Sequence, residues 1–361
     1  MKRNFNSTRI ACNTRCKALR KTTWPLFTLI SLIVILTGCV GSGFNENLAR
    51  MEEPVGPARK YAELETVSEF ETPYIGDASK VGGIISKLPP LSDFYNQNYF
   101  SLDTDQPPYG LTVYYEAYNN SEGKQNPFMT SFAENNALIL FAYIDNLDNV
   151  TFAFREEPSQ GELEESKYKP RYAYSRKELE EKFGNITELK QDLPELYGRL
   201  AANLLIDPEY MHYNRITLGS SLEHIIYRNG EPDGVIQSED GPTVIIYQNL
   251  GEVTYHPPDG ESPVTIPGSS VTFYLDPDYE VLYKISATAA SSSEILWNLN
   301  IEEGTYEEVI ENLGTPAKET VSEDGSLYVS YLLKNTESDY VYFVFSDGHI
   351  VEYGLETVSD I

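Results

Sequence analysis

The chain has 361 residues, in which 27 lysines and arginines face 55 aspartates and glutamates, and its formal net charge is −28. Such a negative field repels nucleic acid and anionic lipid headgroups, so we exclude both as direct partners of the folded part. The length is sufficient for two or three domains with hydrophobic cores of their own.

The N-terminus has the order of a secretory signal. Seven basic residues and no acid precede a short apolar run at 25–35, which is shorter than the ~20 residues of a membrane-spanning helix. The run ends in Leu36-Thr37-Gly38-Cys39, which resembles the lipobox of bacterial lipoproteins. The resemblance implies that a signal peptide, residues 1–38, is removed and that Cys39 carries the lipid, on the outer face of the cytoplasmic membrane. The alternative is an uncleaved anchor with an incidental cysteine.

The two other cysteines, Cys12 and Cys16, lie within the signal. The exported part therefore has no disulfide and no thiol nucleophile. It retains 20 basic and all 55 acidic residues, a formal charge of −35. Such a charge keeps a protein soluble, and it also favours basic partners or cations.

The remainder predicts an α+β fold, in which a tether and an α+β domain precede two tandem helix-plus-antiparallel-sheet repeats. Residues 39–65 contain glycines, prolines and charges without sustained periodicity, and we expect a flexible tether. The α+β domain covers residues 66–206. Apolar spacing and capping signals predict its helices at 78–88, 137–147, 175–184 and 193–204. β-branched and aromatic runs predict strands at 111–115 and 150–154.

Three segments of this domain carry a resemblance: YIGDASKV at 74–81, PYGLTVYY at 108–115 and LFAYIDNLDNVTF at 140–152. They are similar to an uncharacterised extracytoplasmic family of Gram-positive bacteria, a domain of unknown function. That family occurs in lipoproteins and on the outer tail of BlaR-like antirepressor membrane peptidases. The resemblance implies no catalytic residues, and the zinc-peptidase signature His-Glu-x-x-His is absent from the sequence.

Residues 215–289 and 299–357 are predicted to be two copies of one module, each a helix, a Gly-x-Pro turn and three strands. Residues 222–226 correspond to 306–310, and Tyr247 corresponds to Tyr331. After a longer connection in the first copy, the match continues with Phe273, Val281 and Tyr283 on Phe343, Val351 and Tyr353. The pattern resembles the SmpA/OmlA/BamE-like module, which also occurs in tandem in the β-lactamase inhibitor protein. Those are binding or assembly proteins, so the resemblance implies binding.

Signals for chemistry are few. The histidines at 212, 224, 256 and 349 lack metal-ligand spacing, and no nucleophile or phosphate-loop motif occurs. Asp103 with Asp105 and Asp276 with Asp278 resemble parts of calcium loops, although ordinary turns explain both pairs better. We therefore predict no catalytic residue, no metal and no cofactor.

Aromatic residues supply the candidate ligand site. The side chains that we expect to line a groove in the first domain are Tyr114, Tyr115, Tyr143, Phe152 and Phe154. Packing in a core is the alternative role for the same residues.

We therefore expect a non-enzymatic, lipid-anchored binding, sensing or assembly protein outside the cytoplasmic membrane. Its partner would be another envelope protein or a wall-derived ligand. The alternatives are a cell-envelope hydrolase that uses dispersed carboxylates, and a passive scaffold.

Overall fold

The computed structural model describes residues 56–118, 126–237, 241–250, 253–255, 264–266, 269–277, 280–288 and 294–358, which belong to one compact unit. The predicted signal peptide, Cys39 and most of the predicted tether lie outside these residues, as does Asp278. None of the described helices is long and apolar enough to cross a membrane. The chain combines helices and sheets, which confirms the predicted α+β class.

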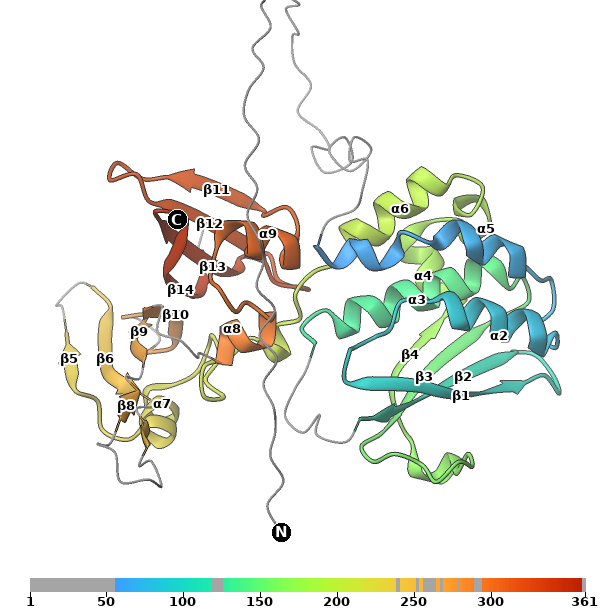
Figure 1. The fold of residues 1–361 in the computed structure, drawn as a ribbon, viewed down its shortest axis with the longest axis horizontal. Coiled ribbons are helices and arrows are strands. Elements are labelled where there is room, and N and C mark those ends of the chain that lie inside the picture. Colours follow the sequence, from blue (N-terminus) through green and yellow to red (C-terminus); the bar gives the residue numbers. More distant parts are fainter. Residues whose placement is uncertain are drawn as a thin grey trace, which may run out of the picture. The chain divides into compact units, whose positions relative to one another are not determined.

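A strap of two 3₁₀ helices opens the described chain, η1 (Gly56–Tyr61) and η2 (Leu64–Phe70) (Figure 1). The prediction of a flexible tether over residues 39–65 is therefore wrong for its last ten residues, which are mostly helical. Tyr61, Leu64 and Val67 are buried at intervals of three residues, the period of a 3₁₀ helix. A spacing of three residues does not fit the period of 3.6 that identifies an α-helix, so the sequence analysis predicted no helix here.

The first sheet has four strands in the order β1-β2-β3-β4. β2 and β3 are parallel and the outer pairs are antiparallel, so the chain needs a crossover between β2 and β3, which α3 (Met129–Tyr143) provides. Both predicted strands are confirmed, as β2 and β3. The strands are β1 (Tyr95–Asp103), β2 (Gly110–Ala117), β3 (Asn149–Arg155) and β4 (Lys169–Ser175).

Helices cover one face of this sheet (Figure 1). Besides α3 they are α2 (Ala78–Lys87), α4 (Arg176–Phe183), α5 (Ile186–Leu189) and α6 (Leu193–Ala202), and a 3₁₀ turn η3 (Glu165–Lys167) precedes β4. The predicted helices at 78–88, 175–184 and 193–204 are confirmed, and α4 has the predicted capping box between Ser175 and Glu178.

Helix α3 was predicted at 137–147 but begins at Met129 and ends at Tyr143. Its first half carries polar residues that look like a surface in the sequence but are buried. The side-chain amides of Asn135 and Asn136 donate hydrogen bonds to the carbonyls of Leu200 and Pro89, both at 2.8 Å. These bonds give the two buried amide groups a carbonyl acceptor each, so the helix extends through them, although Asn136 Oδ1 has no hydrogen-bond donor among the described residues.

The second sheet has eight strands in the order β11-β12-β13-β14-β10-β9-β6-β5. Its first half comprises α7 (Leu222–Asn229), β5 (Gly234–Ile236), β6 (Thr243–Leu250), β9 (Ser269–Leu275) and β10 (Leu282–Thr288). Its second half comprises α9 (Tyr306–Leu313), β11 (Lys318–Val321), β12 (Leu327–Leu332), β13 (Asp339–Ser346) and β14 (His349–Thr357). The remaining elements are η4 (Pro208–Tyr210), α8 (Glu294–Leu299) and a small sheet of β7 (Val253–Tyr255) and β8 (Val264–Ile266).

Each half contains an equivalent hydrogen bond from its sheet to the end of its helix. The Tyr247 hydroxyl donates to the carbonyl of Gly230 at 2.8 Å, and the Tyr331 hydroxyl donates to that of Gly314 at 3.0 Å. Both glycines end their helix at positive φ, 80° and 81°. Each half contributes four strands to the sheet, one more than predicted, because a short strand follows each Gly-x-Pro turn.

The predicted correspondence of the last strands needs a correction of two residues. Phe273 pairs with Ile285, and its counterpart Phe343 pairs with Tyr353. Tyr353 therefore corresponds to Ile285 and not to Tyr283, because the β9–β10 connection is longer than the β13–β14 connection. The halves join through β10 and β14, where Ser286 lies opposite Gly354.

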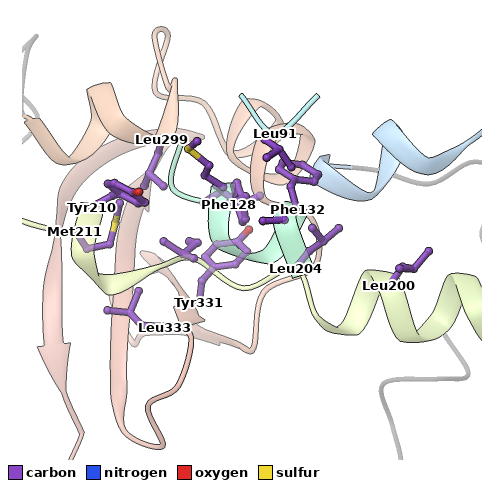
Figure 2. Packing of buried hydrophobic residues seen from close by; sticks show 14 of the residues in the cluster. Leu91, Phe128, Phe132, Leu200, Leu204, Tyr210, Met211, Leu299, Tyr331 and Leu333 are labelled. Atoms are coloured by element: carbon purple, nitrogen blue, oxygen red, sulfur yellow. The ribbon is translucent and has the colours of Figure 1, made fainter. Parts of the chain in front are cut away.

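Buried side chains join the elements of the first sheet to those of the second. Phe128 and Leu204 from the first set lie beside Leu299, Tyr331 and Leu333 from the second (Figure 2).

One lysine crosses this junction. Lys334, on the β12–β13 connection, donates its ammonium to Ser131 and to the Glu134 carboxylate, both at 3.1 Å. Its backbone N–H donates to the carbonyl of Ile206 at 2.7 Å. Glu134 also accepts hydrogen bonds from Lys182 and Asn203, so the buried charges are paired.

Candidate functional site

The five aromatic residues predicted to line a groove are instead buried, none more than 5% exposed. They are Tyr114, Tyr115, Tyr143, Phe152 and Phe154. Tyr115 and Phe154 stack with their ring centroids 5.2 Å apart in the core beneath the helices. Tyr114 lies on the other face of the sheet, against Tyr168. Successive residues of a strand point to opposite faces, so Tyr114 and Tyr115 cannot line one groove.

Tyr115 borders a hollow. The hollow has a volume of about 280 Å³ and lies between the end of α2 and β1, where Leu88 and Tyr118 also line it. Tyr115 itself is only 3% exposed there. The hollow is therefore formed largely by other residues.

A different set of tyrosines lies on the eight-stranded sheet. One face of this sheet packs against α7 and α9, as the hydrogen bonds of Tyr247 and Tyr331 to the helix ends show. The residues that alternate with this buried set point to the opposite face, which we call the open face. Six of them are only partly buried and do not belong to the core formed by the described residues: Val244, Ile246, Tyr274, Tyr328, Tyr340 and Val344. Tyr342 and Ser330 lie on the same face but are buried by their neighbours, at 0% and 2% exposed.

Strand pairing aligns the open face in rows. One row crosses all eight strands and consists of Lys318, Ser330, Tyr342, Gly354, Ser286, Thr272, Ile246 and Gly234. The next row consists of Leu332, Tyr340, Glu356, Lys284, Tyr274, Val244 and Ile236. Mostly small side chains thus lie beside a row of larger ones.

Tyr342 is the centre of a polar and aromatic network on this face. Its ring stacks on that of Tyr328 with centroids 5.5 Å apart, and the Lys284 ammonium lies 4.6 Å from its centroid. The Tyr342 hydroxyl donates to Glu352 at 2.8 Å. The Tyr328 hydroxyl donates to Glu356, whose carboxylate also lies 3.4 Å from Lys284. The network holds these side chains in fixed positions before any partner arrives.

Gly354 makes room for this arrangement. A Cβ atom at this position would lie 1.8 Å from the carbonyl oxygen of Ile285 and 3.0 Å from the Tyr342 ring. A larger residue would therefore displace both the neighbouring strand and the ring.

The two phenols of the network remain hydrogen-bond donors. Burial raises the pKa of Tyr342, and the charge of Glu352 and the hydrogen bond to it raise it further. Burial likewise raises the pKa of Tyr328, with a further contribution from its hydrogen bond to Glu356. Because both hydroxyls stay protonated, the carboxylates remain occupied as acceptors.

The part of the open face that belongs to the first half of the sheet differs in its side chains. Val244 and Ile246 stand where the second half has Tyr328 and Ser330, and Ile236 on the edge strand is 56% exposed. The open face therefore combines an aromatic, hydrogen-bonded half with an aliphatic half. This composition is suited to contact with a protein surface.

The histidines and carboxylates of the described residues form no cluster suited to a metal ion. Among them, no group of three or more histidine, cysteine, aspartate or glutamate side chains could hold a metal ion. His224 is partly buried, and its ring contacts the Arg215 carbonyl. Glu352 and Glu356 are both hydrogen-bonded to tyrosines.

The sequence did contain a signal for the open face. Tyr328, Tyr340, Tyr342, Glu352 and Glu356 occupy alternate strand positions, and apolar residues such as Val329, Val341 and Phe343 lie between them. Only the strand register shows which of the two alternating sets of residues faces the helices.

Comparison with protein families finds a DUF4825 domain, a domain of unknown function, at residues 67–169. This confirms that an uncharacterised domain covers the region where the three sequence segments predicted one. The match includes α2, α3 and strands β1 to β3, and the open face lies outside it. No curated protein matches the chain.

Two solved structures show weak similarity. One is an extracellular protein containing an SCP domain from Bacillus anthracis, 14% identical, with a TM-score of 0.25 over 39% of this chain and 44% of that chain. The other is a cysteine-rich secretory protein from Staphylococcus aureus, 13% identical, with a TM-score of 0.26 over 42% of this chain and 48% of that chain. The chain spans less than half the length of either protein. Similarity at this level supports no conclusion about function.

Proposed function

We propose that the chain is a lipid-anchored, extracytoplasmic binding protein that docks an envelope protein on the open face of its eight-stranded sheet. The observation that carries the proposal is the open face itself. Tyrosines are enriched in protein interfaces because they combine a large apolar ring with a hydrogen-bonding tip. Here Tyr274, Tyr328 and Tyr340 stand on one sheet, and the ring of Tyr328 is already ordered by stacking on the buried Tyr342.

The dimensions of the face agree with this role. Eight strands spaced about 4.8 Å apart, with about five residues each, give an area on the order of 600 Å². A standard interface buries about 800 Å² on each partner. One rigid surface thus supplies most of the area that specific docking requires.

The sequence supports the remaining parts of the proposal. The lipobox-like end at Cys39 supports export and anchoring on the outer face of the cytoplasmic membrane. The similarity of residues 215–289 and 299–357 to tandem SmpA/OmlA/BamE-like modules supports binding or assembly rather than catalysis. The occurrence of similar uncharacterised domains on BlaR-like membrane peptidases supports a partner in the envelope.

Photo-crosslinking in intact cells tests the proposal. Benzoylphenylalanine in place of Tyr340 on the open face is expected to crosslink a specific envelope protein, identified by mass spectrometry. The matched control is the same replacement at Tyr227, an 82% exposed tyrosine on α7. Cys39→Ala, which removes the lipid site, is expected to reduce the crosslink by releasing the protein from the membrane.

Equal crosslinking from positions 340 and 227 would contradict docking on the open face. Turnover of a wall glycan by the purified protein, lost on substitution of a single carboxylate, would replace the binding function with hydrolysis.

A further inference from the structure

A second hollow lies between the strap and the segment around α8 and α9, and it has a volume of about 620 Å³. Arg59 and Lys60 of η1 line it on the strap, and the partly exposed Phe94 adds apolar surface, beside the largely buried Phe128 and Leu299. The volume is within the ~300–1,000 Å³ typical of small-ligand sites.

Ion pairs neutralise two of the carboxylates that line this hollow. Arg59 Nη1 lies 2.9 Å from Glu311 Oε1, and Lys60 Nζ lies 3.4 Å from Asp93 Oδ1. Both cations on the strap therefore already have a partner.

A third carboxylate, Glu308, shapes the loop before α9. It accepts backbone hydrogen bonds from Glu302 at 2.7 Å, Glu303 at 2.9 Å and Gly304 at 2.8 Å. Glu302 is then the one lining carboxylate that has neither a cation nor a backbone N–H as partner among the described residues. The three bonds fix the loop that carries Glu302, which lowers the cost of ordering it around a ligand.

Asparagines provide acceptors near Glu302. The amide groups of Asn298 and Asn312 donate to the carbonyls of Tyr210 and Glu308 at 2.7 Å and 3.0 Å. Their amide oxygens have no hydrogen-bond donor within the described part of the chain. Acceptors of this kind complement the N–H groups of a peptide.

We propose that this hollow binds a lysine-bearing peptide. The ammonium group pairs with Glu302, the methylene stem lies against the partly exposed ring of Phe94, and peptide N–H groups donate to Asn298 and Asn312. The net negative charge of the chain favours approach of such a cation. This site is separate from the open face and does not depend on docking there.

Binding of defined peptides to the full chain, purified in detergent, tests the proposal by titration calorimetry. The probes are acetyl-Ala-Lys-Ala-amide and its norleucine analogue, which keeps the methylene stem and lacks the charge. We expect the lysine peptide to bind about fivefold more tightly, because an exposed ion pair contributes up to about this factor. Glu302→Gln is expected to remove the difference. The matched control is Glu303→Gln, an exposed neighbour that does not line the hollow.

Equal affinity for the two peptides, or no binding of either, would overturn the proposal. So would an unchanged preference in Glu302→Gln, with its fold checked by circular dichroism. Binding of chitotetraose instead of the peptide would assign the hollow to neutral saccharides. None of these outcomes changes the photo-crosslinking from position 340, so the two proposals fail independently.

Discussion

In the four-stranded sheet, Tyr115, Phe152 and Phe154 face the helices and are at most 4% exposed, whereas in the eight-stranded sheet Tyr328 and Tyr340 face away from the helices and remain partly exposed. Both sheets consist of strands rich in aromatic residues. Helix cover is one cause of this difference, but neighbouring side chains also bury Tyr114 on the opposite face of the first sheet, at 5% exposed, and Tyr342 on the open face, at 0%. Aromatic content therefore predicts strands, and only the register separates a core from a binding surface.

The largest loss of stability is expected from a substitution on the helix-covered face of the four-stranded sheet. Phe152 is fully buried beneath the helices. Phe152→Ala leaves a cavity and is expected to lower the free energy of unfolding by about 3–5 kcal/mol. Urea denaturation followed by circular dichroism measures this loss. A loss below about 1 kcal/mol would show that this face is not the sealed core described here.

The second largest loss of stability is expected at the junction between the elements of the two sheets. Lys334→Ala removes a charged hydrogen-bond donor from Glu134, and the expected loss is about 1.5–3 kcal/mol because Lys182 still pairs with this carboxylate. The control is Lys177→Ala, whose partner Glu181 is exposed. That substitution is expected to cost at most about 1 kcal/mol. Equal losses in both variants would mean that Lys334 does not stabilise the junction.

The same cluster predicts a dependence on pH. Burial alone would raise the pKa of Glu134, but the charge of Lys334 and the hydrogen bonds from Lys182 and Asn203 hold it below its ordinary value of 4.5. The stabilisation is therefore present above about pH 4.5 and is lost as the pH falls through the lower pKa of the folded state. Glu134→Gln is expected to flatten the acid side of the curve of melting temperature against pH. The exposed Glu181→Gln serves as control, and identical curves for the two variants would contradict this origin.

How much of this was predictable from the sequence depends on the kind of signal. The stripe at 78–88, the capping box at Ser175 and the helices of the two halves follow local rules, and the structure confirms them. The start of α3 was missed because Asn135 and Asn136 look exposed until their distant partners are known. The strap was missed because its period is three.

The candidate site was less predictable than the fold. Four of the five aromatic residues predicted to line a groove lie on strands and one lies on a helix, and the sequence does not show which face of the sheet the helices cover. The open face depends on rows that cross eight strands, from Lys318 to Gly234. The connections between those strands differ in length in the two halves. Local sequence patterns do not determine such a register.

The smallest effect on stability, and the one that separates the two sheets most directly, is expected from Tyr340→Ala. This side chain is partly exposed on the open face and lies outside the core, so the free energy of unfolding is expected to change by no more than about 0.5 kcal/mol. Loss of a tyrosine at the centre of an interface typically costs 2 kcal/mol or more of binding energy. Crosslinking to the same envelope protein, from benzoylphenylalanine in place of Tyr274, is therefore expected to fall at least tenfold. Destabilisation comparable to that of Phe152→Ala would show that the open face is part of the core, and unchanged crosslinking would show that Tyr340 does not contact the partner.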